Sequence, residues 1–185
     1  MERLGPEVVA DYQSRELKEK IGRYGFMTMH RPSNVDNREV LEGIVEALNK
    51  IAEDLPLLFP IHPRTEKMMA QFGIYFSENV HTFPPLSFRE SLFLWKDAQV
   101  VITDSGGLQE ETTALGVPCV TVRKNTERPV TIEKGTNVLA GISGENILRE
   151  TENALKKTGN PVPKIDGWDG HASERIWKVL LDFLG

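Results

Sequence analysis

The sequence predicts an α/β fold in which a mostly parallel, doubly wound sheet of about six strands is covered by helices on both faces. Three observations support this prediction. Short runs rich in β-branched and aromatic residues recur along the chain, amphipathic stretches of helical length separate them, and the 39% hydrophobic and 26% charged composition is typical of a globular protein. A chain of 185 residues is long enough to bury one core and needs no second one.

Six β-rich runs are the predicted strands. They lie at 24–29, 56–61, 79–83, 98–103, 118–122 and 136–140. Because helical stretches alternate with them, we expect the strands to run in the same direction and to form a parallel sheet.

The first predicted helix follows the first strand. Its apolar residues repeat at helical spacing: Leu41, Ile44, Val45, Leu48 and Ile51. Asp36 and Glu39 have the spacing of a capping box, which predicts that they cap the start of this helix. Further helices are expected at 64–72, 87–96, 107–115, 145–157 and 172–184.

The segment 159–171 is rich in Pro and Gly and is interpreted as a linker within a chain, 1–185, that forms a single domain. It leads to the predicted helix 172–184. An apolar stripe runs along that helix: Ile176, Val179, Leu180 and Phe183. Such a stripe is normally buried, so the helix is expected to dock either on this domain or on one that the sequence lacks.

Composition argues against several classes of partner. The net charge is −5 and no stretch is densely basic, so no nucleic-acid partner is expected. No apolar run approaches the roughly 20 residues of a membrane span, and the charged N-terminus is unlike a secretory signal, so we expect no membrane partner and a cytoplasmic location. The single cysteine, Cys119, lies in the apolar run 118–122 and is expected to be a buried, inert thiol.

Several familiar site motifs are absent from the sequence. It has neither the P-loop pattern nor G-x-G-x-x-G after a strand, so triphosphate hydrolysis and dinucleotide redox chemistry lose support. It also lacks H-E-x-x-H, a cysteine cluster and a dense carboxylate loop. We therefore expect neither a metal nor another cofactor.

Polar residues gather after the predicted strands, at the edge where open parallel sheets bind ligands. His30, Arg31 and Asn34 follow the first strand, and His62 and Arg64 follow the second. A lone histidine is more often structural than functional, but two at strand ends, each with an arginine within two residues, make both interpretations about equally good. We take all five as candidate site residues.

The two remaining histidines, His81 and His171, lack such company and are interpreted as structural or surface residues.

The segment DSGGLQEETTALGVP turns from the fourth predicted strand into a helix. Glycines at Gly106 and Gly107, after Ser105, let a ligand approach the backbone closely. Amides at a helix N-terminus have no intrahelical partner and, with the helix dipole, favour an anion such as a phosphate. Many α/β proteins use the same turn without a ligand, so both interpretations stay open for this segment alone.

Charged residues beside this turn are further candidates. Glu110 and Glu111 lie in the first turns of the helix, where the dipole stabilises a carboxylate even without a ligand. A carboxylate near bound phosphates can also accept hydrogen bonds from a ribose diol, and only one of the two can face inward. Arg128 lies in the loop 123–129, which is either solvated or able to bring a phosphate-binding guanidinium to the same edge.

Four segments together resemble a known family. TMHRPSNVDN, the step His62-Pro63-Arg64, TDSGGLQEETTALGVP and TERP match, in order and approximate spacing, the C-terminal domain of bacterial and archaeal UDP-N-acetylglucosamine 2-epimerases. The resemblance runs from about Tyr24 to the final helix. The combination of DSGGLQEE with ERP is more similar to the non-hydrolysing branch than to the hydrolysing one.

The resemblance implies a Rossmann-like domain that is one half of a GT-B fold, with the substrate in the cleft between the halves. By the family pattern, Ser105, Gly106 and Gly107 would hold the diphosphate, Glu111 the ribose and Arg128 the phosphates. His30 matches an active-site histidine, and His62 matches one associated with UDP-sugar binding.

The activity implied is interconversion of UDP-GlcNAc and UDP-ManNAc for polysaccharide biosynthesis, by loss and return of UDP through a 2-acetamidoglucal intermediate, without a cofactor. Acidic residues thought to act on the sugar belong to the family's N-terminal domain, which this sequence lacks. The expected partners are therefore UDP, a UDP-N-acetylhexosamine and that N-terminal domain, with a homodimer left open. The chain alone is expected to be inactive.

Two alternatives remain at this stage. One is a stand-alone UDP-sugar-binding module, which would need no partner half. The other is the nucleotide-binding half of a GT-B glycosyltransferase, against which the His30 cluster and the ERP loop argue.

Overall fold

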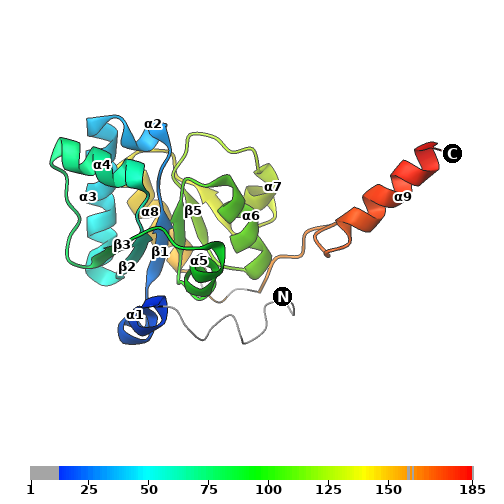
Figure 1. Cartoon of the computed structure of the whole chain (residues 1–185), viewed down its shortest axis with the longest axis horizontal. Coiled ribbons are helices and arrows are strands. Elements are labelled where there is room, and N and C mark those ends of the chain that lie inside the picture. The colour runs from blue at the N-terminus through cyan, green and yellow to red at the C-terminus, as the bar shows by residue number, and fades with distance from the viewer. Residues whose placement is uncertain (1–12, 158, 160, 185) are drawn as a thin grey trace.

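The computed structural model describes residues 13–157, 159 and 161–184, and it contains a six-stranded sheet with helices packed around it (Figure 1). The strands are β1 Gly25–Thr28, β2 Leu57–Pro60, β3 Val80–Phe83, β4 Val101–Thr103, β5 Cys119–Thr121 and β6 Asn137–Leu139. The helices are α1 Gln13–Ile21, α2 Pro32–Val35, α3 Arg38–Asp54, α4 Pro63–Phe72, α5 Phe88–Trp95, α6 Gly106–Leu115, α7 Pro129–Glu133, α8 Gly144–Leu155 and α9 Ala172–Leu184.

All six strands are parallel and lie in the order β3-β2-β1-β4-β5-β6, which confirms the predicted doubly wound sheet. The chain builds outward from β1 on one side and then returns to build outward from β4 on the other. The pairing of β1 with β4 aligns Thr28 with Thr103. The reversal of strand order between β1 and β4 leaves a crevice at their carboxyl ends, where ligands of such sheets usually bind.

Alternate residues of the strands face two separate cores, as the pleat of a strand requires. Met27 and Ile102 point to a core closed by α3, α4 and α8. Phe26 and Val101, their neighbours, point to a second core closed by α5 and α6, with Ile21 of α1 against it. Burial on both faces explains why the strands are almost continuously apolar.

The stripe predicted for the first helix is buried in α3, but the predicted capping box at Asp36 is wrong. The cap is Asn37, whose side chain accepts a hydrogen bond from the amide of Val40. Asp36 instead ends the short helix α2, and its carboxylate forms an ion pair with Arg64. The ion pair with Arg64, in the first turn of α4, directs the Asp36 carboxylate away from the start of α3.

Three helices were not among those predicted: α1, α2 and α7. Two of them, α2 and α7, are single turns that begin with a proline, Pro32 and Pro129. Proline is well suited to the first position of a helix because it has no amide to leave unpaired. Turns this short have no periodic apolar stripe from which a sequence could predict them.

Cys119 begins β5, between β4 and β6, and is fully buried, as predicted. Burial raises the pKa of its thiol to about 11, because the apolar interior disfavours a thiolate. The thiol is therefore unreactive at neutral pH.

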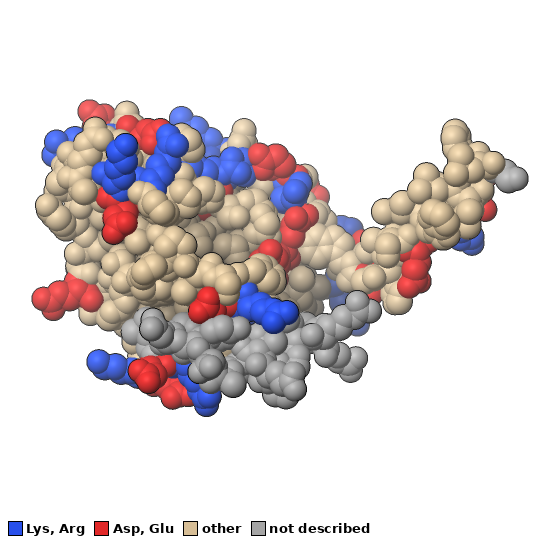
Figure 2. All heavy atoms as spheres, in the orientation of Figure 1, with Lys and Arg blue, Asp and Glu red and all other residues tan. Residues whose placement is uncertain are grey.

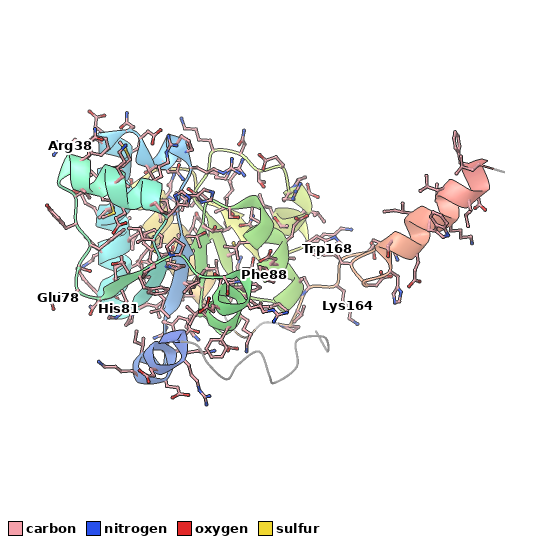
Figure 3. All side chains as sticks on the ribbon, in the orientation of Figure 1. Arg38, Glu78, His81, Phe88, Lys164 and Trp168 are labelled. Carbon is pink, nitrogen blue, oxygen red and sulfur yellow. The ribbon has the colours of Figure 1, made fainter. Side chains whose placement is uncertain are left out.

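Helix α9 has none of its residues buried, and Figure 1 shows it extending away from the sheet and its helices. The chain leaves the domain near Val162, whose side chain lies against Gly116 at the end of α6. Figure 3 shows Lys164 and Trp168 on the segment that then leads to α9. The exposed residues of α9 include most of its large apolar side chains: Ile176, Trp177, Val179, Leu180, Leu181, Phe183 and Leu184.

No helix in the described part of the chain is both long and apolar enough to span a bilayer.

Helices α3 and α8 cross closely at two glycines, and the crossing gives a test of the packing. A Cβ atom added at Gly144 would lie 2.4 Å from the carbonyl oxygen of Gly43. We expect Gly144→Ala to lower the free energy of unfolding by about 1–3 kcal/mol, because a backbone atom cannot move aside as a flexible side chain can.

The matched control is Gly43→Ala in the same crossing, where an added Cβ meets nothing within 4 Å. Replacing a glycine inside a helix with alanine should raise stability by about 0.5–1 kcal/mol. Urea unfolding of both variants measures the two effects. A shift of the same sign in both would contradict the described crossing.

Candidate functional site

The candidate site lies where β1 and β4 end side by side. The hydroxyl groups of Thr28 and Thr103 are 2.8 Å apart, and they tie the two strand ends together. Beyond them, the loop after β1 carries His30 and the turn after β4 carries Ser105. Both residues line one pocket, together with His62 from the loop after β2.

A fully buried carboxylate, Asp104, organises the first loop. Its Oδ2 atom accepts hydrogen bonds from the amides of His30 and Arg31 at 2.9 and 2.8 Å and from the side-chain amide of Asn34 at 3.2 Å. The Arg31 guanidinium also donates to the backbone carbonyl of Asp104. Burial alone would raise the pKa of Asp104, but hydrogen bonds from the His30 side chain and from the two amides lower it below its usual value. Asp104 is therefore ionised at neutral pH.

Asn34 is itself fully buried. Its amide nitrogen donates both to Asp104 and to the carbonyl of Val122 at the end of β5. Asn34 thereby joins the loops that follow three different strands. A direct ligand contact for Asn34 stays a prediction, and in this arrangement its amide supports Asp104.

His30 is partly exposed and faces Asp104. Its Nδ1 atom lies 3.1 Å from Asp104 Oδ1. The hydrogen bond to the Asp104 side chain raises the pKa of His30, against the opposing effects of partial burial and of the nearby Arg31 charge. The rings of His30 and His62 are 5.5 Å apart, so the structure brings together the two histidines that the sequence singled out.

His62 and Arg64, the two candidates that follow β2, each have a hydrogen-bond partner nearby in the fold. His62 is the N-cap of α4, and its Nδ1 atom accepts a hydrogen bond from the amide of Arg64 at 3.1 Å. The Arg64 guanidinium binds the carboxylate of Asp36 through two nitrogens, and both side chains are exposed. Arg64 is thus directed toward α2, and its contact with a ligand stays a prediction.

The N-terminus of α6 is open on its outer side. Ser105 is the N-cap residue, yet its side chain makes no capping hydrogen bond. A Cβ atom added at Gly106 would meet nothing within 4 Å, and one added at Gly107 would meet only the Glu111 carboxylate, at 3.6 Å. The protein's own packing does not require glycine at either position, and the absence of side chains leaves the backbone amides there uncovered.

The two acidic residues of α6, Glu110 and Glu111, have different surroundings, as expected for side chains that point in different directions. Glu110 forms an ion pair with Arg128, with 3.0 Å between Oε2 and Nε. Glu111 is half-buried, and its pKa is raised by burial and by the charge of Glu110. Arg128 is thereby held beside the first turns of α6, and Glu111 lies over Gly107. Their contacts with phosphates and ribose stay predictions.

A buried network of neutral side chains holds the loop that carries Arg128, and sequence reasoning did not find it. Gln109 is fully buried, donates to the carbonyl of Ser105 and accepts hydrogen bonds from Thr126 and Asn137. Thr126 in turn accepts a hydrogen bond from the amide of Arg128. The signal available in the sequence was that amide and hydroxyl side chains occupy the positions of α6 that an apolar stripe would normally fill.

Chemically, the arrangement suits an anionic ligand with polar groups beside the anion. Figure 2 shows Lys and Arg side chains concentrated along the edge where α2 lies, with acidic side chains among them. The open end of α6 adds backbone amides to this positive edge. Within the described residues, no cluster of His, Cys, Asp or Glu is suited to hold a metal ion.

Comparison with known proteins identifies the family. Residues 2–181 match the profile described as UDP-N-acetylglucosamine 2-epimerase. The chain is 40% identical over 163 residues to a UDP-N-acetylglucosamine 2-epimerase of Methanocaldococcus jannaschii, a match covering 85% of this chain and 44% of that one. A UDP-2,3-diacetamido-2,3-dideoxy-D-glucuronate 2-epimerase of Pseudomonas aeruginosa is 36% identical, with 84% and 44% covered.

Solved structures agree with the sequence matches. The crystal structure of the M. jannaschii UDP-GlcNAc 2-epimerase in complex with UDP-GlcNAc and UDP superimposes with a TM-score of 0.81 at 36% identity, over 97% of this chain and 49% of that one. The chain thus spans about half the length of the relatives that it matches. With a profile match over nearly its whole length, this chain belongs to the UDP-N-acetylglucosamine 2-epimerase family.

Proposed function

We propose that this chain is the UDP-binding half of a two-domain epimerase that interconverts UDP-GlcNAc and UDP-ManNAc. The observation that carries the proposal is the open N-terminus of α6 at the reversal point of the sheet, beside the pocket of His30 and His62. An anion-binding helix end next to side chains able to move protons suits a substrate whose leaving group is a diphosphate.

The assignment of UDP to this half also draws on the relatives. The M. jannaschii and P. aeruginosa proteins are named for different sugars, but both names contain UDP and both give carbon 2 as the epimerised centre. The half of each chain that they share with this one therefore suits the common part of the two substrates, the nucleotide.

In the proposed reaction a base removes the proton from C2 of the sugar. The electrons of the C2–H bond form a C1=C2 double bond, and the C1–O bond breaks with its electron pair leaving on the β-phosphate of UDP. UDP then returns to C1 while a proton is added to the opposite face of C2. The amides at Gly106 and Gly107, with Arg128, would stabilise the departing diphosphate, and His30 is the candidate for proton transfer on this half.

We further propose that α9 docks on the other half of the enzyme. Its large apolar side chains are exposed, and Phe183 and Leu184 are 84% and 78% exposed. A patch of this size on an isolated helix normally marks an interaction surface. The relatives are about twice as long as this chain, so the second half of such an enzyme is the partner that we assign to α9.

The first prediction concerns UDP binding. Arg128→Ala should weaken binding of UDP by about tenfold or more, because a lost charge-assisted hydrogen bond costs roughly 1.5–3 kcal/mol and because Glu110 loses its cation. Titration calorimetry with UDP measures the affinity.

The matched control is Lys124→Ala, which removes an exposed cation from the same loop. Arg123 is unsuitable because it is buried and bound through two nitrogens to Glu127. Equal losses in the Arg128 and Lys124 variants would contradict the assignment of Arg128, and no heat from the parent chain at millimolar UDP would contradict the proposed function.

The second prediction is that the chain alone neither epimerises UDP-GlcNAc nor exchanges its C2 proton. Proton abstraction needs a positioned acid-base pair in a site closed to water, and each such group contributes about 10²- to 10⁴-fold. Proton NMR in deuterated water follows both processes. Turnover near that of a full-length relative would show that the chemistry resides in this half.

The third prediction tests docking of α9. When the chain is mixed with the half of the M. jannaschii relative that it does not cover, the emission of Trp177, 62% exposed, should shift to shorter wavelength. Leu180→Asp should abolish the shift, whereas Lys178→Asp, a change of polar side chain on the same helix, should preserve it. A shift that survives Leu180→Asp would exclude the apolar stripe as the docking surface.

A further inference from the structure

The two histidines of the pocket differ in what their Nδ1 atoms contact. A neutral imidazole has one nitrogen that donates and one that accepts, and the partners decide which is which. His30 and His62 line the same pocket with their rings 5.5 Å apart. The tautomers of these two rings therefore decide which atoms the pocket offers to a ligand.

At His30 the Nδ1 atom faces a carboxylate oxygen. Asp104 is fully buried and its Oδ2 atom already accepts three N–H groups, whereas its Oδ1 atom has no hydrogen-bond partner among the described residues apart from the His30 ring. His30 Nδ1 lies 3.1 Å from that Oδ1 atom. A lone pair on Nδ1 would repel the buried oxygen, whereas a proton there supplies the donor that it needs.

At His62 the Nδ1 atom faces a donor instead. Pro63 begins α4 and has no amide hydrogen, so the amide of Arg64 is the first one that needs a cap. It donates to His62 Nδ1 at 3.1 Å. A nitrogen that accepts this bond carries a lone pair, which places the proton of the neutral ring on Nε2.

We propose that Asp104 is a positioning residue that holds His30 with its proton on Nδ1, opposite to His62, so that the pocket offers an acceptor at His30 Nε2 beside a donor at His62 Nε2. The catalytic meaning of this arrangement rests on the proposed function, in which His30 transfers a proton. The arrangement of the two tautomers does not depend on the proposed function, because it follows from hydrogen bonds within the chain.

The arrangement has a consequence for a ligand group that contacts the Nε2 atoms of both rings. An acceptor beside a donor suits a group that also has both, such as a sugar hydroxyl or an acetamido N–H and C=O. A phosphate oxygen only accepts, so it suits the pair only when His30 carries a second proton. Two charged groups affect whether His30 takes up this second proton. The Asp104 carboxylate favours the protonated ring, and the Arg31 guanidinium opposes it.

Asp104→Asn separates this proposal from a purely structural role for Asp104. Three N–H groups converge at the Oδ2 position, so the single oxygen of the asparagine amide takes that place. Its NH₂ group then faces His30 Nδ1. Because two donors cannot face each other, the neutral His30 ring should move its proton to Nε2.

The experiment is long-range ¹H–¹⁵N correlation NMR of the ¹⁵N-histidine-labelled chain as a function of pH. The four histidines are assigned with His30→Gln and His62→Gln variants. Neutral His30 should be protonated at Nδ1 and neutral His62 at Nε2 in the parent chain. In Asp104→Asn, the His30 proton should move to Nε2 and the pKa of His30 should fall, while His62 is unchanged.

Asp97→Asn is the matched control, since it removes another carboxylate with an ion-pair partner, Lys18, on a different part of the chain. Both tautomers should survive that change. A parent chain with His30 protonated at Nε2, or a folded Asp104→Asn variant with an unchanged His30, would overturn the proposal. If Asp104→Asn does not fold, the parent spectrum decides, because opposite tautomers support the proposal and equal ones refute it.

The spectra need no nucleotide, so this inference and the proposed function can fail separately. Opposite tautomers in a chain that does not bind UDP would support the positioning role and contradict the proposed function. Equal tautomers in a chain that binds UDP would do the reverse.

Discussion

The carboxylate of Asp104 is the interaction on which the site depends. Placing an ionised group in the interior of a protein is costly unless its oxygens are hydrogen-bonded, and here three N–H groups converge on one of them. Two of the donors are backbone amides of the loop after β1. The loop that carries His30 is therefore held by a charge on the neighbouring strand end, and its conformation follows from the need to solvate that charge.

On the side of the site that carries Arg128, neutral side chains hold the loop in place. Gln109, Thr126, Thr131 and Asn137 form a chain of hydrogen bonds that reaches both the amide and the carbonyl of Arg128. Buried polar networks are rigid when every member is satisfied. One half of the site is thus positioned by a buried charge and the other by amides and hydroxyls, which leaves the charges of Arg31 and Arg128 to act near the surface.

The strands and the long helices could be predicted from sequence because their apolar patterns are local. Every predicted strand contains an observed one, and the stripe of α3 is buried as expected. That the candidate residues after β1, β2 and β4 gather in one pocket could be predicted too, since strand ends meet at one edge of a parallel sheet. The partners of the side chains could not. Arg64 with Asp36, and Asn34 with Val122, join residues that are distant in sequence, and no local pattern encodes such pairs.

The parallel pairing of β1 with β4 has a consequence for the order in which the chain folds. Thr28 and Thr103 are 75 residues apart, roughly twice the separation between β1 and β2, and each doubling of a closed loop costs about 0.6 kcal/mol of chain entropy. Contacts so distant in sequence form slowly. His30 and Asp104 come together only through this pairing. The crevice between these strands therefore cannot exist in a partly folded chain that has only the β1–β2–β3 side, so the proposed binding of UDP requires that both sides of the sheet have assembled.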